Sequence, residues 1–116
     1  MPVLKKSDVE MSEIAPGVER WEIVSGELGA ESLTVADLTI APGSRAPTHT
    51  HPTEEAMIIV DGELEAVIGD DVVTVKEGET VLAAAGVKHG FVNRSGFPAR
   101  VMGVFPTGKV ERTFAD

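Results

Sequence analysis

Residues 43–62 read GSRAPTHTHPTEEAMIIVDG and carry the strongest fold signal in the chain. His49 and His51 lie two residues apart, and side chains at that spacing point to the same face of an extended strand. Glu55 follows four residues after His51, beyond a proline-containing turn, and has the same parity as Met57 on the strand that follows. One face of a β structure therefore collects two imidazoles and a carboxylate.

Short segments rich in β-branched residues follow one another along the chain. The 12 glycines and 7 prolines separate them, and strands at such regular short spacing are typical of an all-β sandwich or barrel. The predicted strands are Arg20–Val24, Ser32–Ile40, Ala56–Val60, Glu63–Ile68, Val72–Lys76, Thr80–Ala83, His89–Asn93 and Arg100–Phe105. The predicted hairpin turns are Asp61-Gly62, Gly69-Asp70-Asp71 and Glu77-Gly78.

The N-terminal segment allows two interpretations. Ser7-Asp8-Val9-Glu10 fits a capping box that would begin a short helix, whereas Pro16-Gly17 would end any helix soon after. We favour an extended arm over residues 1–18. Because the chain has no repeat, linker or low-complexity tract, we expect a single domain over residues 1–116.

Composition and charge exclude several classes of function. A net charge of −9 disfavours a nucleic-acid partner. The absence of cysteine removes disulfides, thiolate metal sites and cysteine nucleophiles, and the absence of tyrosine removes a phenolic acid or base. No apolar stretch approaches the roughly 20 residues of a membrane span, and residues 1–8 lack the apolar core of a signal peptide. We therefore expect a cytoplasmic protein.

The third histidine, His89, lies forty residues beyond His49 and must come from another strand, where it shares a face with Phe91 and Asn93. Imidazole and carboxylate ligands suit iron, manganese, nickel, zinc or copper. A divalent ion bound by two imidazoles needs further ligands, and His89 and Glu55 are the candidates. Glu54, adjacent but of opposite parity, is expected to be a solvated charge.

Two segments resemble the sequence motifs of the cupin superfamily. The first motif, residues 43–62, is matched at Gly43, His49, His51, Glu55 and Gly62. The second motif, residues 78–93, is matched at Gly78, Gly86, His89 and Asn93. Ala84 departs from the pattern because proline is usual there, but the departure removes no metal ligand.

The resemblance implies a double-stranded β-helix, which is a small jelly-roll barrel, with His49, His51, Glu55 and His89 holding one divalent ion inside. An ion that prefers six ligands keeps about two positions open for water, substrate or dioxygen. The resemblance also implies a homodimer in which the N-terminal arm packs on a neighbour. Trp21 is then either an anchor in that interface or a residue at the rim of the pocket.

The pocket residues favour a class of substrate. We expect Met57, Ile59, Leu82, Ala84, Phe91 and Asn93 to line the pocket. By parity Lys88 and Arg94 point away from His89, which leaves Arg45 and Arg100 as candidate cations inside. The expected substrate is therefore an uncharged or metal-chelating small molecule, such as an enol, a dicarbonyl or an aromatic compound.

Three hypotheses about function follow. In the first, the protein is a metal-dependent dioxygenase, with Glu55 as both ligand and proton acceptor. In the second, it is a non-redox isomerase or lyase in which the ion polarises a carbonyl and stabilises an enolate. In the third, it binds or senses a small molecule without chemistry, since the same fold serves many functions.

Overall fold

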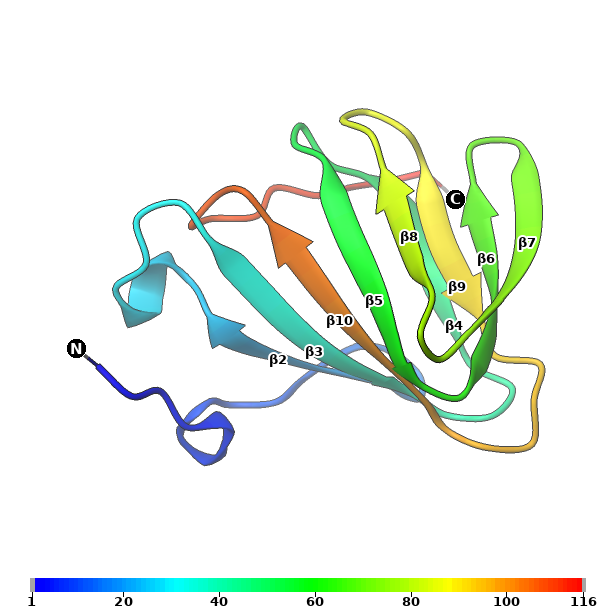
Figure 1. Cartoon of the computed structure of the whole chain (residues 1–116), viewed down its shortest axis with the longest axis horizontal. Helices are drawn as coiled ribbons and strands as arrows, with labels where there is room; N and C mark the ends of the chain where they lie inside the picture. The colour runs from blue at the N-terminus through cyan, green and yellow to red at the C-terminus, as the bar shows by residue number, and fades with distance from the viewer. Residues whose placement is uncertain (1, 116) are drawn as a thin grey trace.

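The computed structural model describes residues 2–115, and its strands form two antiparallel β-sheets packed face to face (Figure 1). The first sheet has the order β1 (Ser12–Ala15), β2 (Val18–Val24), β3 (Thr34–Ile40), β10 (Ala99–Phe105), β5 (Glu55–Asp61) and β8 (Thr80–Ala83). The second has the order β11 (Thr113–Phe114), β4 (Arg45–Thr50), β9 (His89–Val92), β6 (Glu63–Ile68) and β7 (Asp71–Lys76). The predicted all-β jelly-roll architecture is confirmed.

Each predicted strand overlaps an observed one, but three observed strands were not predicted. These are β1, β4 and β11. Strand β4 reads RAPTHT, so it contains a proline and lacks apolar alternation, and β11 has only 2 residues. Such strands are stabilised by their neighbours rather than by their own composition. Within residues 2–115 no helix is long and apolar enough to cross a membrane.

The inner faces of the two sheets form the hydrophobic core. Strand β6 buries Leu64 and Ala66, whereas Glu63, its first residue, is exposed, as its alternating sequence predicts. Leu64 is 1% exposed and packs in the same cluster as Ile59 and Val101 from the opposite sheet. Burial of this apolar surface is the main force that holds the two sheets together.

The turn between β5 and β6 depends on a glycine. Gly62 has a φ of 86°, a conformation that side-chain-bearing residues rarely adopt. A Cβ there would also lie 2.9 Å from the carbonyl oxygen of Pro98. At Gly62 the chain turns sharply, so β5 ends and β6 begins at the same rim of the barrel although the two strands belong to different sheets.

The N-terminal segment packs against the first sheet of its own chain. It contains a 3-10 helix, η1 (Lys6–Asp8), followed by β1, which pairs with β2. The ammonium of Lys6 lies 3.0 Å from a carboxylate oxygen of Asp37 and 4.0 Å from the centre of the Trp21 ring. Trp21 is thus half-buried under Lys6. A second 3-10 helix, η2 (Gly26–Leu28), follows β2.

Candidate metal centre

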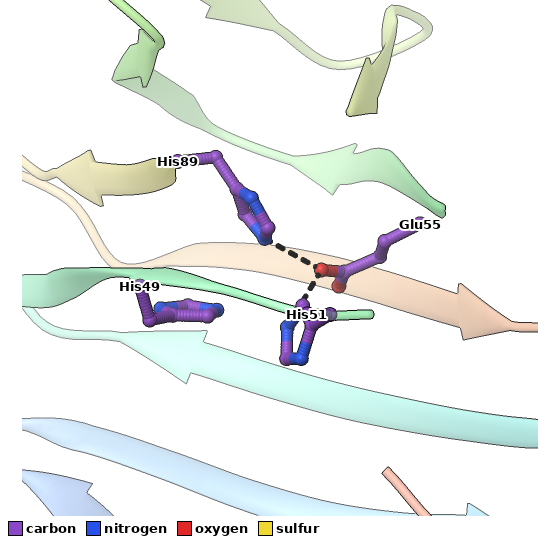
Figure 2. Close-up of side chains that lie close together, drawn as sticks. All are labelled: His49, His51, Glu55 and His89. Carbon is purple, nitrogen blue, oxygen red and sulfur yellow. Dashed lines mark hydrogen bonds and ion pairs between the residues drawn. The ribbon is translucent and has the colours of Figure 1, made fainter. Parts of the chain in front are cut away.

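Three histidines and one glutamate meet at the end of the barrel where β5 and β9 begin (Figures 1 and 2). His49 on β4 is the register partner of His89 on β9, His51 directly follows β4, and Glu55 is the first residue of β5. One potential ligand atom from each of the four side chains lies within 4.8 Å of the others. The structure therefore brings together the four residues predicted to bind a metal.

A β-bulge in β4 turns His49 toward the interior. Ala46 pairs with Phe91 and His49 with His89, so three steps along β4 oppose two steps along β9. One extra residue reverses the side-chain parity, and Ala46 and His49 consequently face the same cavity. Gly90 makes room for the bulge, because a Cβ there would lie 2.8 Å from the carbonyl oxygen of Ala46.

Each imidazole is oriented by a backbone carbonyl. A carbonyl oxygen only accepts hydrogen bonds, so the Nδ1 atom must carry a hydrogen, and in the neutral ring the Nε2 lone pair remains free for a metal. The Nε2 atom of His51 is buried and has no hydrogen-bond partner within residues 2–115. The donors and acceptors are His49 and Pro47 (2.7 Å), His51 and Glu111 (2.7 Å), and His89 and Val87 (3.0 Å).

Glu55 supplies the single carboxylate of the cluster. It is 7% exposed, and its Oε1 atom lies 2.8 Å from Nε2 of His89 and 3.3 Å from Nε2 of His51 (Figure 2). Its Oε2 atom occupies the space beside Gly103, where a Cβ would approach it to 2.7 Å. The cluster offers three imidazole nitrogens and one carboxylate, and one of these nitrogens, Nε2 of His51, has no hydrogen-bond partner within residues 2–115. This set of ligands suits a divalent transition metal.

The charges of the cluster are coupled. Burial raises the pKa of Glu55, but the His51 and His89 imidazoles outweigh this and hold it below its usual value. Burial lowers the pKa of His89, yet its contact with Glu55 dominates and raises that pKa. Burial lowers the pKa of His49 to about 4, so this ring is neutral at pH 7. The contact between His89 and Glu55 therefore favours the charged form of each group.

A narrow cavity adjoins the cluster. Its volume is about 30 Å³, which is room for about two water molecules. Met57 and Phe91 line it, as predicted from the sequence. The remaining lining is mostly apolar and includes Ile14, Ala36, Leu38 and Val101. This space accepts a small molecule or one end of a larger one.

Other predicted pocket residues lie elsewhere. Leu82 is 67% exposed and Ala84 is also exposed, so the prediction is wrong for both. Strand β8 instead turns Val81 and Ala83 inward, and the only sign of this in its sequence is the polar Thr80, which shares the outer face with Leu82. Ile59 is buried in the core, outside the cavity lining.

Asn93 is a structural residue rather than a lining residue. It is fully buried, and its amide nitrogen donates to the carbonyl oxygens of Ile40 (2.9 Å) and Phe97 (2.8 Å). Its Oδ1 atom accepts from the backbone nitrogen of Ser95 at 3.0 Å. It thus fixes the loop between β9 and β10.

Two arginines that sequence reasoning missed also line the cavity: Arg20 on β2 and Arg112 just before β11. Lys88 and Arg94 are exposed, as expected, and Arg100 binds Asp37 on the outer side of the sheet. The cavity therefore contains two guanidinium groups, but they come from Arg20 and Arg112 and not from the candidates Arg45 and Arg100. Arg20 has the same parity as the buried Val18 on β2, which was a weak signal that its side chain points inward. Arg112 lies in a segment without an alternating hydrophobic pattern, so its sequence carried no such signal.

Comparison with known proteins agrees with this geometry. The sequence matches the cupin domain over residues 36–105. It is 26% identical over 106 residues to the tetracenomycin polyketide synthase protein TcmJ of Streptomyces glaucescens, covering 86% of this chain and 71% of that protein.

Two solved structures have a similar fold. The polyketide cyclase RemF from Streptomyces resistomycificus superposes with a TM-score of 0.80 at 22% identity, covering 100% of this chain and 87% of that one. The oxalate decarboxylase of Lactobacillus farciminis, in complex with formate, superposes with a TM-score of 0.84 at 18% identity, covering 93% of this chain and 34% of that one. At these identities the likeness is one of fold.

Proposed function

The chain belongs to the cupin domain family, and on this basis we propose that it is a metal-dependent enzyme that enolises a small chelating enol or dicarbonyl compound. One observation carries the proposal. The potential ligand atoms of His49, His51, Glu55 and His89 converge within 4.8 Å, while backbone carbonyls hold the Nδ1 side of every ring. A site oriented in this way is built for an ion with positions left open to substrate.

The residues of the cluster have separate tasks in this proposal. The three Nε2 atoms and the Glu55 carboxylate would hold the ion, which is iron, manganese, nickel, zinc or copper. When bound, a divalent ion supplies Lewis acidity and stabilises negative charge on a substrate oxygen. Met57 and Phe91 give the cavity an apolar wall, and electrostatic interactions are stronger in such surroundings than in water.

Glu55 is the proposed proton acceptor. It is the carboxylate that lines the cavity among residues 2–115, and the chain has no cysteine or tyrosine and only 3 histidines, all in the cluster. Its Oε2 atom would take a proton from the carbon beside a substrate carbonyl, which leaves an enolate. The enolate would attack a second carbonyl carbon, and the proton would return to the alkoxide oxygen formed there.

The comparisons support a cyclising reaction over an oxidative one. The relatives are named as a polyketide synthase protein and a polyketide cyclase, and ring closure between carbonyl groups requires an enolate. A dioxygenase acting on the same enol, dicarbonyl or aromatic compound is the second candidate. The mostly apolar lining of the cavity favours it, because dioxygen partitions readily into such surroundings.

The experiment compares Glu55→Gln with Glu54→Gln, since these neighbouring carboxylates differ in burial and position. Zinc-loaded protein is incubated anaerobically with acetylacetone in deuterium oxide, and exchange at the carbon between the carbonyls is followed by NMR. We expect wild type and Glu54→Gln to accelerate exchange above the blank, and Glu55→Gln to lose about 100-fold or more of that acceleration.

Other outcomes would overturn this function. Oxygen consumption by iron-, nickel- or copper-loaded protein, without anaerobic exchange by the zinc form, would favour the dioxygenase. Tight metal-dependent binding of the dicarbonyl with no exchange and no oxygen uptake would favour a binding or sensing role.

We also propose that the protein forms a homodimer. The outer side of β8 and β5 exposes Leu82 (67%), Ile58 (40%) and Val60 (38%), and apolar side chains gathered on one exposed face favour association. Light scattering should give a mass of twice 12.2 kDa. The variant Leu82→Asn should shift the protein toward monomer, and a monomeric wild type would contradict the proposal.

A further inference from the structure

The cavity beside the metal cluster is lined by two arginines, each of which has a buried nitrogen without a hydrogen-bond partner within residues 2–115. Arg20 is 7% exposed, and its Nη2 atom is buried without a hydrogen-bond partner in the described part of the chain. The Nε atom of Arg112 is likewise buried and unpartnered within residues 2–115. Buried charged donors are normally paired, because leaving them unpaired costs the free energy of their lost hydration.

The fold holds both arginines in place. Arg20 is anchored on β2 by its Nη1 atom, which donates to Glu22, and this leaves Nη2 free to face the cavity. The residue before Arg112, Glu111, accepts the Nδ1 hydrogen of His51 through its backbone carbonyl at 2.7 Å. The same short segment therefore orients one candidate ligand and brings a guanidinium to the cluster.

The two guanidiniums of the cavity act on each other. Arg20 and Arg112 line the cavity together with the carboxylate of Glu55, and Glu22 pairs with Arg20 from outside the lining. Burial and the neighbouring charge of Arg20 lower the pKa of Arg112, and the charges of Glu55 and Glu22 offset only part of this effect. An anion bound at the unpartnered nitrogens would supply the hydrogen-bond acceptors that they lack and would reduce the repulsion between the two guanidiniums.

We propose that Arg20 and Arg112 form a binding site for a substrate carboxylate, placed beside the metal cluster. A guanidinium presents N–H groups in a planar fork that matches the two oxygens of a carboxylate. The inference rests on the proposed function, in which the metal binds the carbonyl end of the substrate while the arginines bind its carboxylate. It narrows the substrate class to carboxylic acids that carry an enolisable carbonyl, such as β-keto acids. The small cavity suits a planar carboxylate.

The test uses two compounds that differ in charge and by one methyl group: acetoacetate and its uncharged methyl ester. Binding of each to zinc-loaded protein is measured by isothermal titration calorimetry. We expect wild type to bind acetoacetate at least about tenfold more tightly than the ester. Arg20→Gln and Arg112→Gln should abolish most of this preference, and Arg20→Lys should retain part of it.

The matched control is Arg94→Gln, which removes an exposed guanidinium paired with Glu65 on the surface. It should keep the wild-type preference. A measurement that needs no variant is the melting temperature of wild type, which should rise more with acetoacetate than with the ester. Equal affinity of wild type for both compounds, or a preference unchanged in both cavity variants, would overturn the inference.

The test of the carboxylate site and the test of the proposed function can fail independently of each other. If the arginine-dependent preference is present but anaerobic exchange is absent, the carboxylate site stands and the enolising function fails. If exchange of acetylacetone is accelerated but the preference is absent, the function stands and the carboxylate site fails.

Discussion

Nε2 of His89 donates to Oε1 of Glu55 at 2.8 Å, while Nδ1 of the same ring donates to the carbonyl oxygen of Val87 at 3.0 Å. Both nitrogens of this ring act as donors, which is the arrangement of an imidazolium. The raised pKa of His89 and the lowered pKa of Glu55 have the same cause, because each charge stabilises the other against the cost of burial. A metal needs the Nε2 lone pair, so it has to displace this proton.

Metal binding should therefore release a proton and weaken in acid. Below the raised pKa of His89, zinc affinity should fall by about tenfold per pH unit, since one proton competes with one ion. Titration calorimetry in two buffers with different ionisation enthalpies measures the protons released. Identical apparent enthalpies in both buffers at a pH below that pKa would contradict the prediction.

The fold and the metal cluster were predictable from sequence for a physical reason. Parity along an extended chain places His49 and His51 on one face, and the turn after His51 returns Glu55 to the same interior. The prediction for Leu82 was wrong because β8 has only 4 residues, three of them apolar, so Thr80 alone distinguishes its two faces. Arg20 and Arg112 were missed because contacts between distant segments, not local pattern, bury them.

His51→Ala should lose most of its bound metal. The substitution removes one of four candidate ligands and leaves Nε2 of His89 as the remaining nitrogen close to Glu55. We expect zinc affinity to fall at least about 100-fold. Elemental analysis after dialysis measures occupancy. Thr50→Ala is the neighbouring control and should retain wild-type metal content, whereas unchanged metal in His51→Ala would refute the assigned site.

Gly103→Ala should disturb the centre without disturbing the backbone. The new Cβ would lie 2.7 Å from Oε2 of Glu55, so the carboxylate has to move away from the position it shares with the histidines. We expect zinc affinity to drop by about tenfold or more. Gly96→Ala is the matched control, because its Cβ would meet nothing within 4 Å. Equal zinc affinities of the two variants would mean that Glu55 has room to adapt.

The metal-free protein should lose stability in mild acid through His49. Burial lowers the pKa of this ring from 6.5 to about 4, so the unfolded chain binds its proton first. The folded state is then disfavoured progressively as the pH falls from 6.5 to about 4. His89 acts in the opposite direction, because its raised pKa adds stability that is present below 6.5 and lost as the pH rises.

The variant His49→Gln isolates the effect. It has no proton to gain, so its free energy of unfolding should decline less between pH 6.5 and about 4 than that of wild type. Urea denaturation of both proteins in a chelator, at the two ends of this range, measures the difference. Parallel declines would show that His49 is not the group responsible.

Asn93→Ala should destabilise the fold and leave metal binding intact. The substitution leaves the carbonyl oxygens of Ile40 and Phe97 without their buried donor and removes the acceptor of Ser95. Each unsatisfied buried group costs about 1 to 3 kcal/mol, so we expect a loss of about 2 to 4 kcal/mol in the free energy of unfolding. Urea denaturation measures this loss. Ser95→Ala should cost less, because it removes only one hydroxyl, whose single hydrogen is shared between Asn93 Oδ1 at 2.7 Å and the Phe97 carbonyl oxygen at 3.0 Å. If Asn93→Ala lost zinc affinity at unchanged stability, Asn93 would instead contribute to the pocket. A residue that only fixes the loop between β9 and β10 can affect the metal centre only by changing the stability of the whole barrel.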